Sequence, residues 1–88
     1  MDIEDTLTQF VAQELLRGRV TVEPEDNLLG EGMVDSLGML RLVAFIDERF
    51  GLKVPPGEVT IENFRSIEVL TDYLKRALAG NEDVRRTG

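Results

Sequence analysis

The stretch GMVDSLGMLRL, residues 32–42, marks the point where a charged loop changes into an apolar helix. Asp35 and Ser36 stand at this change. Both residue types begin helices, because their side-chain oxygens accept hydrogen bonds from the N–H groups that the first turn leaves unpaired. Helix capping alone would therefore explain Ser36, and any second role has to come from its surroundings.

The helix that follows is predicted to run from Ser36 to Phe50. At about 100° per residue, one of its faces collects the apolar side chains that a helical core needs. These residues are Met39, Leu42, Val43, Ile46 and Phe50.

A second side of the same helix is also apolar. Leu37, Leu40 and Ala44 lie there, with charged residues beside them, and Phe45 stands apart near Arg41. A helix that is apolar on two sides is either buried all round or shares its second side with a partner. Spacing alone does not say which face is inside.

Two further segments show helical periodicity. One is predicted over residues 3–17 with Gly18 at its end, and the other over Ser66–Ala79 with Gly80 after it. Between the first two helices, residues 19–35 predict a long ordered loop, although the alternation in residues 19–23 also fits a short strand. The loop has four apolar residues that could anchor it: Val20, Val22, Leu28 and Leu29.

The fold class predicted is all-α: an antiparallel bundle of three main helices with a short fourth element near residues 58–64. Residues 1–79 form one domain and residues 80–88 a polar tail, as expected for a chain of 88 residues. The alternative is an α+β domain that pairs strands near residues 19–23 and 58–62.

Composition excludes several classes of function. The net charge is −7, which repels phosphate backbones and anionic membranes and favours partners with basic patches. With no cysteine and no histidine, disulfides, thiolate nucleophiles and zinc sites of the usual kind are excluded, and no metal site is expected. The start of the chain lacks a signal peptide, and no apolar run approaches the ~20 residues that span a bilayer, so a cytoplasmic protein is expected.

The order of these features resembles the acyl and peptidyl carrier protein family. The shared features are a long acidic loop, Gly32, Asp-Ser-Leu at residues 35–37 opening an apolar helix, Phe50-Gly51 closing it, and a last helix through Asp72-Tyr73-Leu74. The resemblance covers about residues 3 to 78. It implies the acyl-carrier bundle and a protein that holds an acyl or aminoacyl group as a thioester and performs no chemical step itself.

In that family the serine of the motif, here Ser36, carries a 4′-phosphopantetheine arm attached by a separate phosphopantetheinyl transferase. The matching aspartate, here Asp35, is associated with the magnesium ion used during that transfer. A phosphodiester at this place would meet the unpaired N–H groups and positive end of a helix. The arm would also supply the thiol that the chain lacks.

The resemblance also gives the second apolar side of the helix a purpose, which is docking on the enzyme that receives the arm. The residues expected to contact partners are Leu37, Leu40, Arg41, Ala44, Asp47 and Glu48. The two acidic ones would steer the protein toward basic partners. The protein is expected to act as a monomer.

Two positions depart from carriers of fatty acid synthesis. Those proteins have acidic residues directly after the motif and at the position of Arg41, whereas this chain has Gly38 and Arg41. The motif Gly-x-x-Asp-Ser-Leu-Gly is similar to that of free-standing carriers loaded by adenylating enzymes, including D-alanyl, peptidyl and aminoacyl carriers. This favours a specialised pathway with an adenylating loading enzyme and a downstream transferase or synthase.

Other functions leave part of the sequence unexplained. A serine hydrolase needs a base beside its nucleophile, and the chain has no histidine for that role. Residues 23–36 do not fit the ligand spacing of an EF-hand loop. An unmodified acidic helical domain that binds another protein explains the periodicity and the charge equally well. It does not explain the setting of Asp-Ser-Leu.

Overall fold

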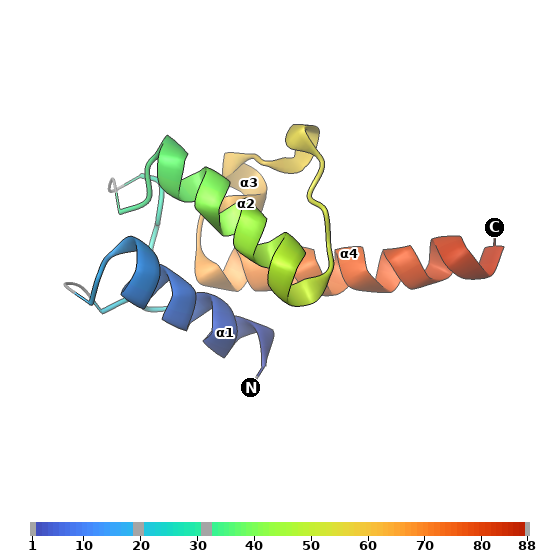
Figure 1. Ribbon diagram of the computed structural model, residues 1–88, viewed down its shortest axis with the longest axis horizontal. Coiled ribbons are helices and arrows are strands. Elements are labelled where there is room, and N and C mark those ends of the chain that lie inside the picture. The colour runs from blue at the N-terminus through green and yellow to red at the C-terminus, as the bar shows by residue number, and fades with distance from the viewer. Residues whose placement is uncertain (1, 19–20, 31–32, 88) are drawn as a thin grey trace.

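The computed structural model describes residues 2–18, 21–30 and 33–87 of the chain, with side chains up to Ala79. Six helical elements follow one another (Figure 1): α1 (Ile3–Gln9), the π-helix η1 (Phe10–Leu15), α2 (Ser36–Phe50), the 3-10 helix η2 (Pro56–Glu58), α3 (Ile61–Phe64) and α4 (Ile67–Thr87). The described segments contain no strand, so the all-α prediction is confirmed.

The α+β alternative is wrong over these segments. Residues 21–23 have no regular structure, and residues 19 and 20 lie outside the described part. The second predicted strand, near residues 58–62, is instead the end of η2 and the start of α3. Thr60 caps α3 by accepting a hydrogen bond at 3.3 Å from the backbone N–H of Asn63. This local cap favours a helical turn over the extended chain that the alternation suggested.

The first helix changes type halfway. Asp2 caps α1, because its side chain accepts a hydrogen bond at 2.8 Å from the N–H of Asp5. From Phe10 the chain is a π-helix, and the N–H of Leu16 donates to the carbonyl of Val11 at 2.9 Å. The predicted helix over residues 3–17 is therefore an α-helix followed by a π-helix that ends at Leu15.

The last helix is longer than predicted. Ser66 caps α4 as expected, since its hydroxyl accepts a hydrogen bond at 3.2 Å from the N–H of Val69. The helix does not stop before Gly80 but continues to Thr87 and extends past the other helices (Figure 1). A glycine inside a helix costs only about 1 kcal/mol relative to alanine, so it does not by itself end one.

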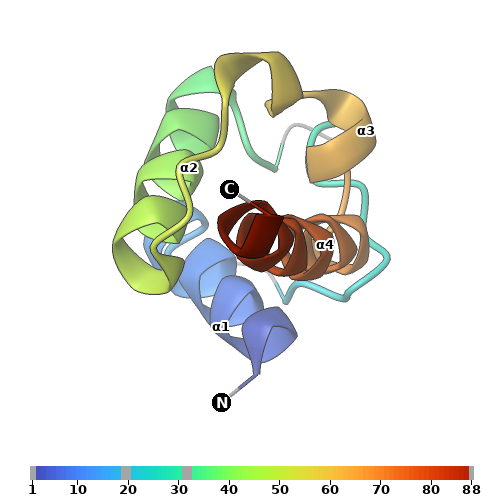
Figure 2. The same ribbon diagram turned by 90° about the vertical axis from the view of Figure 1, so that its right-hand side faces the viewer.

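The core lies between α4 and the helices packed around it, which Figure 2 shows nearly along the α4 axis. Both α1 and α3 pack against α4, and α2 packs against η1. The core is mainly aliphatic, with Phe64 as its one completely buried aromatic ring, and its largest fully buried side chains are Leu7, Val11, Leu28, Leu42, Ile46, Phe64, Ile67, Leu70 and Leu74. This set agrees with a composition that is poor in aromatic residues.

The long loop between η1 and α2 is held in place from both sides. Of its predicted anchors, Val22 and Leu28 are buried and Leu29 is half-buried, while Val20 falls outside the described residues. The N–H of Leu28 donates to the carbonyl of Arg65 at 2.8 Å. Because this loop leads directly into α2, these contacts fix the place where α2 begins.

The connection from α2 to α3 is fastened to α4 through Tyr73. The Tyr73 hydroxyl donates a hydrogen bond to the carboxylate of Glu58, and the side-chain amide of Asn63 donates to the Glu58 carbonyl at 3.0 Å. Burial of the phenol, followed by the Glu58 carboxylate, raises the pKa of Tyr73 to about 12. The η2 helix is thereby tied to both α3 and α4.

Candidate functional site

Ser36 is the first residue of α2, but it does not cap the helix. The cap is Asp35, whose backbone is extended and whose side chain accepts a hydrogen bond at 2.8 Å from the N–H of Gly38. The Ser36 side chain is exposed, and no hydrogen bond found among the described residues uses its hydroxyl. Capping is therefore not the reason for a serine at position 36.

The chain offers only one other serine for comparison. Ser66 is 5% exposed and its hydroxyl caps α4 by accepting a hydrogen bond from Val69. A hydroxyl that is buried and already engaged in a cap is closed to an enzyme. Of the two serines, Ser36 is the one with an accessible hydroxyl.

The backbone around Ser36 is held by the loop beneath it. The N–H of Val34 donates to the carbonyl of Leu28 at 3.0 Å, and both side chains are buried. Gly38 is also buried, and a Cβ placed there would lie 3.1 Å from Cγ1 of Val34. Glycine thus lets the first turn of α2 approach the loop closely, which explains one of the two departures noted in the sequence.

The place suits a phosphate ester on physical grounds. The N–H groups of the first helical turn are only partly satisfied, and the positive end of the helix dipole favours a negative group by about 0.3–1 kcal/mol at an exposed site. The Asp35 carboxylate accepts a hydrogen bond from the N–H of Gly38 and would lie beside such a phosphate. The exposed Ser36 hydroxyl is the only further group that an ester requires, so the site fits a phosphopantetheine arm.

The question of which face of α2 is inside is answered by burial. Leu42 and Ile46 are completely buried, while Leu37 and Leu40 are 66% and 68% exposed. Ala44 is exposed as well. The predicted core face is therefore the inner face, and the second apolar side of α2 faces outward.

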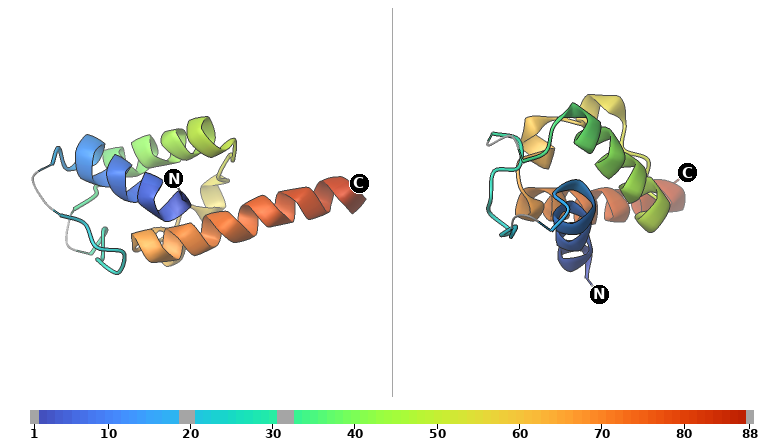
Figure 3. Two further views of the ribbon diagram at one scale, coloured as in Figure 1. Left: turned by 90° about the horizontal axis from the view of Figure 1, so that it is seen from below. Right: turned by 60° about the vertical axis from the view of Figure 1, so that its left-hand side comes forward.

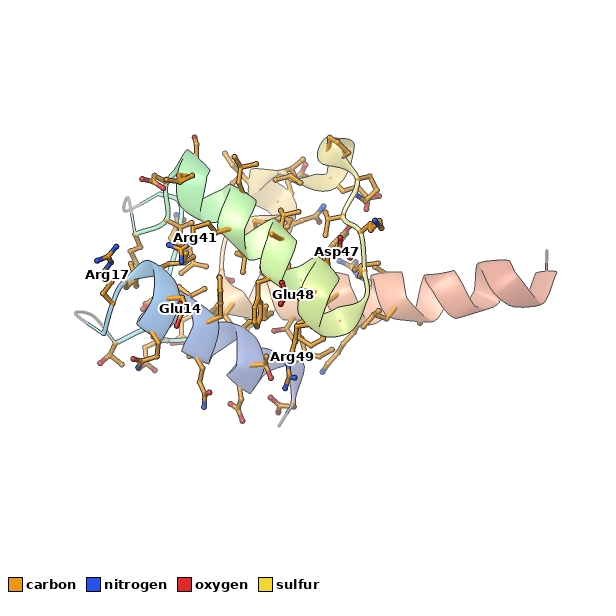
Figure 4. The ribbon with its side chains drawn as sticks, in the orientation of Figure 1. Glu14, Arg17, Arg41, Asp47, Glu48 and Arg49 are labelled. Carbon is orange, nitrogen blue, oxygen red and sulfur yellow. The ribbon has the colours of Figure 1, made fainter. Side chains whose placement is uncertain are left out.

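The three charged residues predicted to contact partners lie along this outer side of α2, where Figure 4 labels them. Arg41 and Glu48 are exposed. Oδ2 of Asp47 lies 3.9 Å from the Nζ of Lys53; the Lys53 side chain is exposed and that of Asp47 is about half exposed. Lys53 partly offsets the charge of Asp47, so Glu48 is the freer of the two acidic groups.

One exposed apolar residue was not predicted from the sequence. Ile61, at the start of α3, is 66% exposed and is the third large apolar side chain that the described residues leave in solvent, after Leu37 and Leu40. Ile61 lies in a segment too short for its periodicity to show whether it is a helix or a strand. No prediction of which way this side chain faces was therefore possible from the sequence.

A pocket of about 190 Å³ also lies at the start of α2, formed by Asp35, Leu37 and Gly38 together with residues from the end of η1 and the chain after it. Arg17 and Arg41 both line it. Arg17 comes from the other side of the long loop, so its place beside α2 depends on how η1 packs and not on local sequence.

The groove between η1 and α2 is larger, about 510 Å³. Its floor is the stacked pair Phe10 and Phe45, whose ring centroids are 4.1 Å apart, and Ala44 and Glu48 line its α2 side. Phe45, which stood apart in the helical pattern, is thus half-buried against the π-helix. Figure 3 shows the blue N-terminal helical segment running next to the green α2.

One predicted element of the motif cannot be placed, because Gly32 lies outside the described residues. Across the described segments no helix has both the length and the apolarity to cross a membrane. Within the same segments, no cluster of three or more acidic side chains is arranged to hold a metal ion.

Comparison with known proteins gives one family match and several relatives. Residues 5–74 match the family described as a phosphopantetheine attachment site. The D-alanyl carrier protein of Abiotrophia defectiva is 35% identical over 68 residues, which is 76% of this chain and 86% of that protein. Aminoacyl carrier protein 2 of Bradyrhizobium diazoefficiens is 39% identical over 72 residues, or 80% of each chain.

A solved structure is similar as well. One chain of a structure described as "Crystal structure of FAD-dependent dehydrogenase" superposes with a TM-score of 0.72 and is 32% identical. The match covers 76% of this chain and 96% of that chain. The shared fold therefore includes nearly the whole of the matched chain.

Proposed function

Because the chain belongs to the family of phosphopantetheine carrier proteins, which hold acyl or aminoacyl groups and catalyse no reaction themselves, we propose that Ser36 is the residue that carries the arm. The observation that supports this most is the contrast between the two serines. Ser36 has an exposed hydroxyl at the positive end of α2, and Ser66 is buried and occupied as a cap. A phosphopantetheinyl transferase would attach the arm.

In this proposal Asp35, the attached arm and the rest of the protein each have a separate role. Asp35 fixes the first turn of α2 by its bond to Gly38 and lies beside the phosphate, where the family resemblance associates it with the magnesium ion used during transfer. The arm, when attached, supplies the thiol that forms the thioester. The protein itself supplies position and recognition.

The outer side of α2 is proposed to be the docking face for partner enzymes. Leu37, Leu40 and Ala44 form its apolar centre, and exposed apolar side chains grouped on one side of a helix are typical of protein interaction sites. Arg41, Asp47 and Glu48 lie at its edges and would set the orientation of the partner.

The carried group is proposed to be loaded by an adenylating enzyme in a specialised biosynthetic pathway. Gly38 and Arg41 stand where carriers of fatty acid synthesis have acidic residues, and two of the relatives are named D-alanyl and aminoacyl carrier proteins. These observations favour an aminoacyl group over a fatty acyl chain. We place the protein in the cytoplasm and expect it to work as a monomer.

A flavin-dependent dehydrogenase is proposed as one class of downstream partner, beside a transferase or synthase. The support is the description of the similar solved structure, which names an FAD-dependent dehydrogenase. Such an enzyme would oxidise the carried group while the thioester holds it.

The experiment that tests the carrier role is the intact mass of the protein after co-expression with a broad-specificity phosphopantetheinyl transferase. The parent and Ser66→Ala are expected to gain the mass of one phosphopantetheine, and Ser36→Ala is expected to gain none. Absence of the gain in the parent would favour the unmodified interaction domain. A gain in Ser36→Ala would place the arm elsewhere.

A further inference from the structure

Two arginines that are far apart in the sequence meet at the start of α2. Arg17 follows η1, and Arg41 lies one turn of α2 beyond Leu37. Both line the pocket of about 190 Å³ that Asp35, Leu37 and Gly38 also form. We call Arg17 and Arg41 the arginine patch. Figure 4 shows the two side chains on the same side of the molecule.

The patch has no carboxylate partner among the described residues, where the one ion pair within 4 Å joins Lys53 to Asp47. Arg41 donates only a long hydrogen bond, at 3.5 Å, to the backbone carbonyl of Glu14. Asp35 lies in the same pocket, but its Oδ1 is engaged by the N–H of Gly38. Two arginines and one carboxylate line the pocket, so its lining carries a net positive charge in a protein whose net charge is −7.

The patch is not placed to hold the phosphate of the arm. Ser36 and Arg41 are five residues apart, so their side chains leave α2 about 140° apart around the helix axis. The pocket is lined by both neighbours of Ser36 but not by Ser36 itself. Arg41 instead shares a face of α2 with Leu37, because residues four apart on a helix lie on one face, and Arg17 lines the same pocket as both.

We propose, on the basis of the carrier role and docking face described above, that the arginine patch binds carboxylate side chains of a partner enzyme. The patch adjoins Leu37, one of the exposed apolar residues of the docking face, and arginine paired with an apolar anchor is common at the centre of protein interfaces. Planar guanidinium groups bind carboxylates through two parallel hydrogen bonds.

The charges along α2 would then fix the direction in which a partner lies. Arg41 lies in the second turn of α2, and the carboxylate of Glu48, which forms no ion pair with another described residue, is about two turns further on. A partner with acidic side chains opposite the patch and a basic side chain opposite Glu48 matches this pattern in one direction only. A partner surface that is basic throughout would be repelled by the two arginines near the start of α2, so such a partner is disfavoured.

The test uses the whole protein without its arm and two synthetic helical peptides that share an apolar leucine face. One peptide carries glutamates beside that face and the other carries lysines at the same positions. Chemical shift changes of the backbone amides and of the arginine Nε–H groups are followed by NMR during each titration. The glutamate peptide is expected to shift the NMR signals of Leu37, Arg17 and Arg41.

Charge reversal supplies the matched comparison. The double variant Arg17→Glu/Arg41→Glu is expected to bind the glutamate peptide about five- to tenfold more weakly than the parent, since two exposed ion pairs are removed. Lys75→Glu/Arg76→Glu changes the net charge equally on the exposed side of α4 and should have a clearly smaller effect. Arg17→Lys/Arg41→Lys should keep part of the affinity. Circular dichroism of every variant checks the fold.

Two results would overturn the assignment: shifts from the glutamate peptide that lie away from Leu37 and the patch, or equal weakening by the two charge reversals. Neither depends on loading of Ser36, because the titration needs no transferase. If the protein does not gain the arm but binds the glutamate peptide as expected, the carrier role is wrong and the arginine patch is supported. If it gains the arm but does not bind the peptide at the patch, only the proposal for the patch is wrong.

Discussion

The Asp35 side chain and the Gly38 backbone N–H are joined by a hydrogen bond of 2.8 Å, and this bond spans the first turn of α2 over Ser36. It satisfies one of the N–H groups that a helix start leaves unpaired. Because Asp35 does the capping, the serine next to it is free to serve another purpose. Helix capping and an accessible hydroxyl are thus divided between two neighbouring residues.

The two roles of Asp35 are separable by mutation. Asp35→Ala removes the cap and should lower the free energy of unfolding by about 1 kcal/mol, measured by urea denaturation. Asp35→Asn keeps a capping oxygen but no charge, so its stability should match the parent while its rate of loading by the transferase falls. Equal loading of Asp35→Asn and the parent would show that the carboxylate has no part in the transfer.

Gly38 should not accept a large side chain. Gly38→Leu forces atoms against Val34 and the η1 end, and overpacking of this kind lowers the free energy of unfolding by about 1–3 kcal/mol. Gly57→Leu is the control, since nothing lies within 4 Å of a Cβ built there. Similar losses for both variants would mean that the close approach of α2 to the loop is unimportant.

Leu40 tests the docking face without disturbing the core. Leu40→Asp changes a side chain that is 68% exposed, so the free energy of unfolding should stay within about 0.5 kcal/mol of the parent. Its KM as a substrate of the transferase should rise, because the apolar contact is lost. An unchanged KM would remove Leu40 from the contact surface.

Arg17 adopts a left-handed backbone conformation, with φ of 56°, at a position after the helix end where glycine is usual. Arg17→Gly relieves this conformation and should raise the free energy of unfolding by about 1 kcal/mol, less the extra freedom that glycine gives the unfolded chain. Arg17→Ala keeps the Cβ and should show no such gain. A less stable Arg17→Gly would indicate that the side chain stabilises the fold.

Tyr73 should make stability sensitive to alkaline pH. Its pKa is raised to about 12 in the folded protein against 10.0 for the free side chain, so the neutral phenol favours the folded state. This contribution is complete below pH 10 and is lost as the pH rises toward 12. The difference in unfolding free energy between the parent and Tyr73→Phe should therefore shrink over that interval.

The chain contains a single tyrosine, which makes a direct check possible. Ultraviolet absorbance of the tyrosinate should titrate near pH 12 in the folded protein and near pH 10 in urea. The same midpoint in both states would mean that Glu58 and burial do not hold the phenol. Glu58→Gln should lower the folded midpoint, since it removes the carboxylate charge that opposes ionisation.

Much of the fold could be predicted because the helices carry their own signals. The bounds of α2 agree with Ser36 and Phe50 since Asp35, the apolar stripe and Gly51 all act locally. The end of α4 was predicted wrongly at Gly80, because a glycine weakens a helix without stopping it. The short element predicted near residues 58–64 is present as the end of η2 and α3, where Thr60 gives a local cap. The π-helix was not predicted, because nothing in the helical periodicity of residues 3–17 distinguishes it from an α-helix.

The site was predicted in part for the same reason. The Asp-Ser-Leu motif is local and could be read directly, but the burial of Ser66 and the outward face of Leu40 required the packed structure. Arg17 could not be connected to Arg41 from sequence. The two are brought together by the packing of η1 on α2 across a long loop.

The central claim is that the arm is attached to Ser36, and tryptic mapping of the loaded protein tests it most directly. Cleavage after arginine and lysine puts Ser36 in the peptide of residues 20–41 and Ser66 in that of residues 66–75. The account predicts phosphopantetheine on the first peptide, with fragment ions that locate it at Ser36. An arm on the second peptide, or on neither, would contradict it.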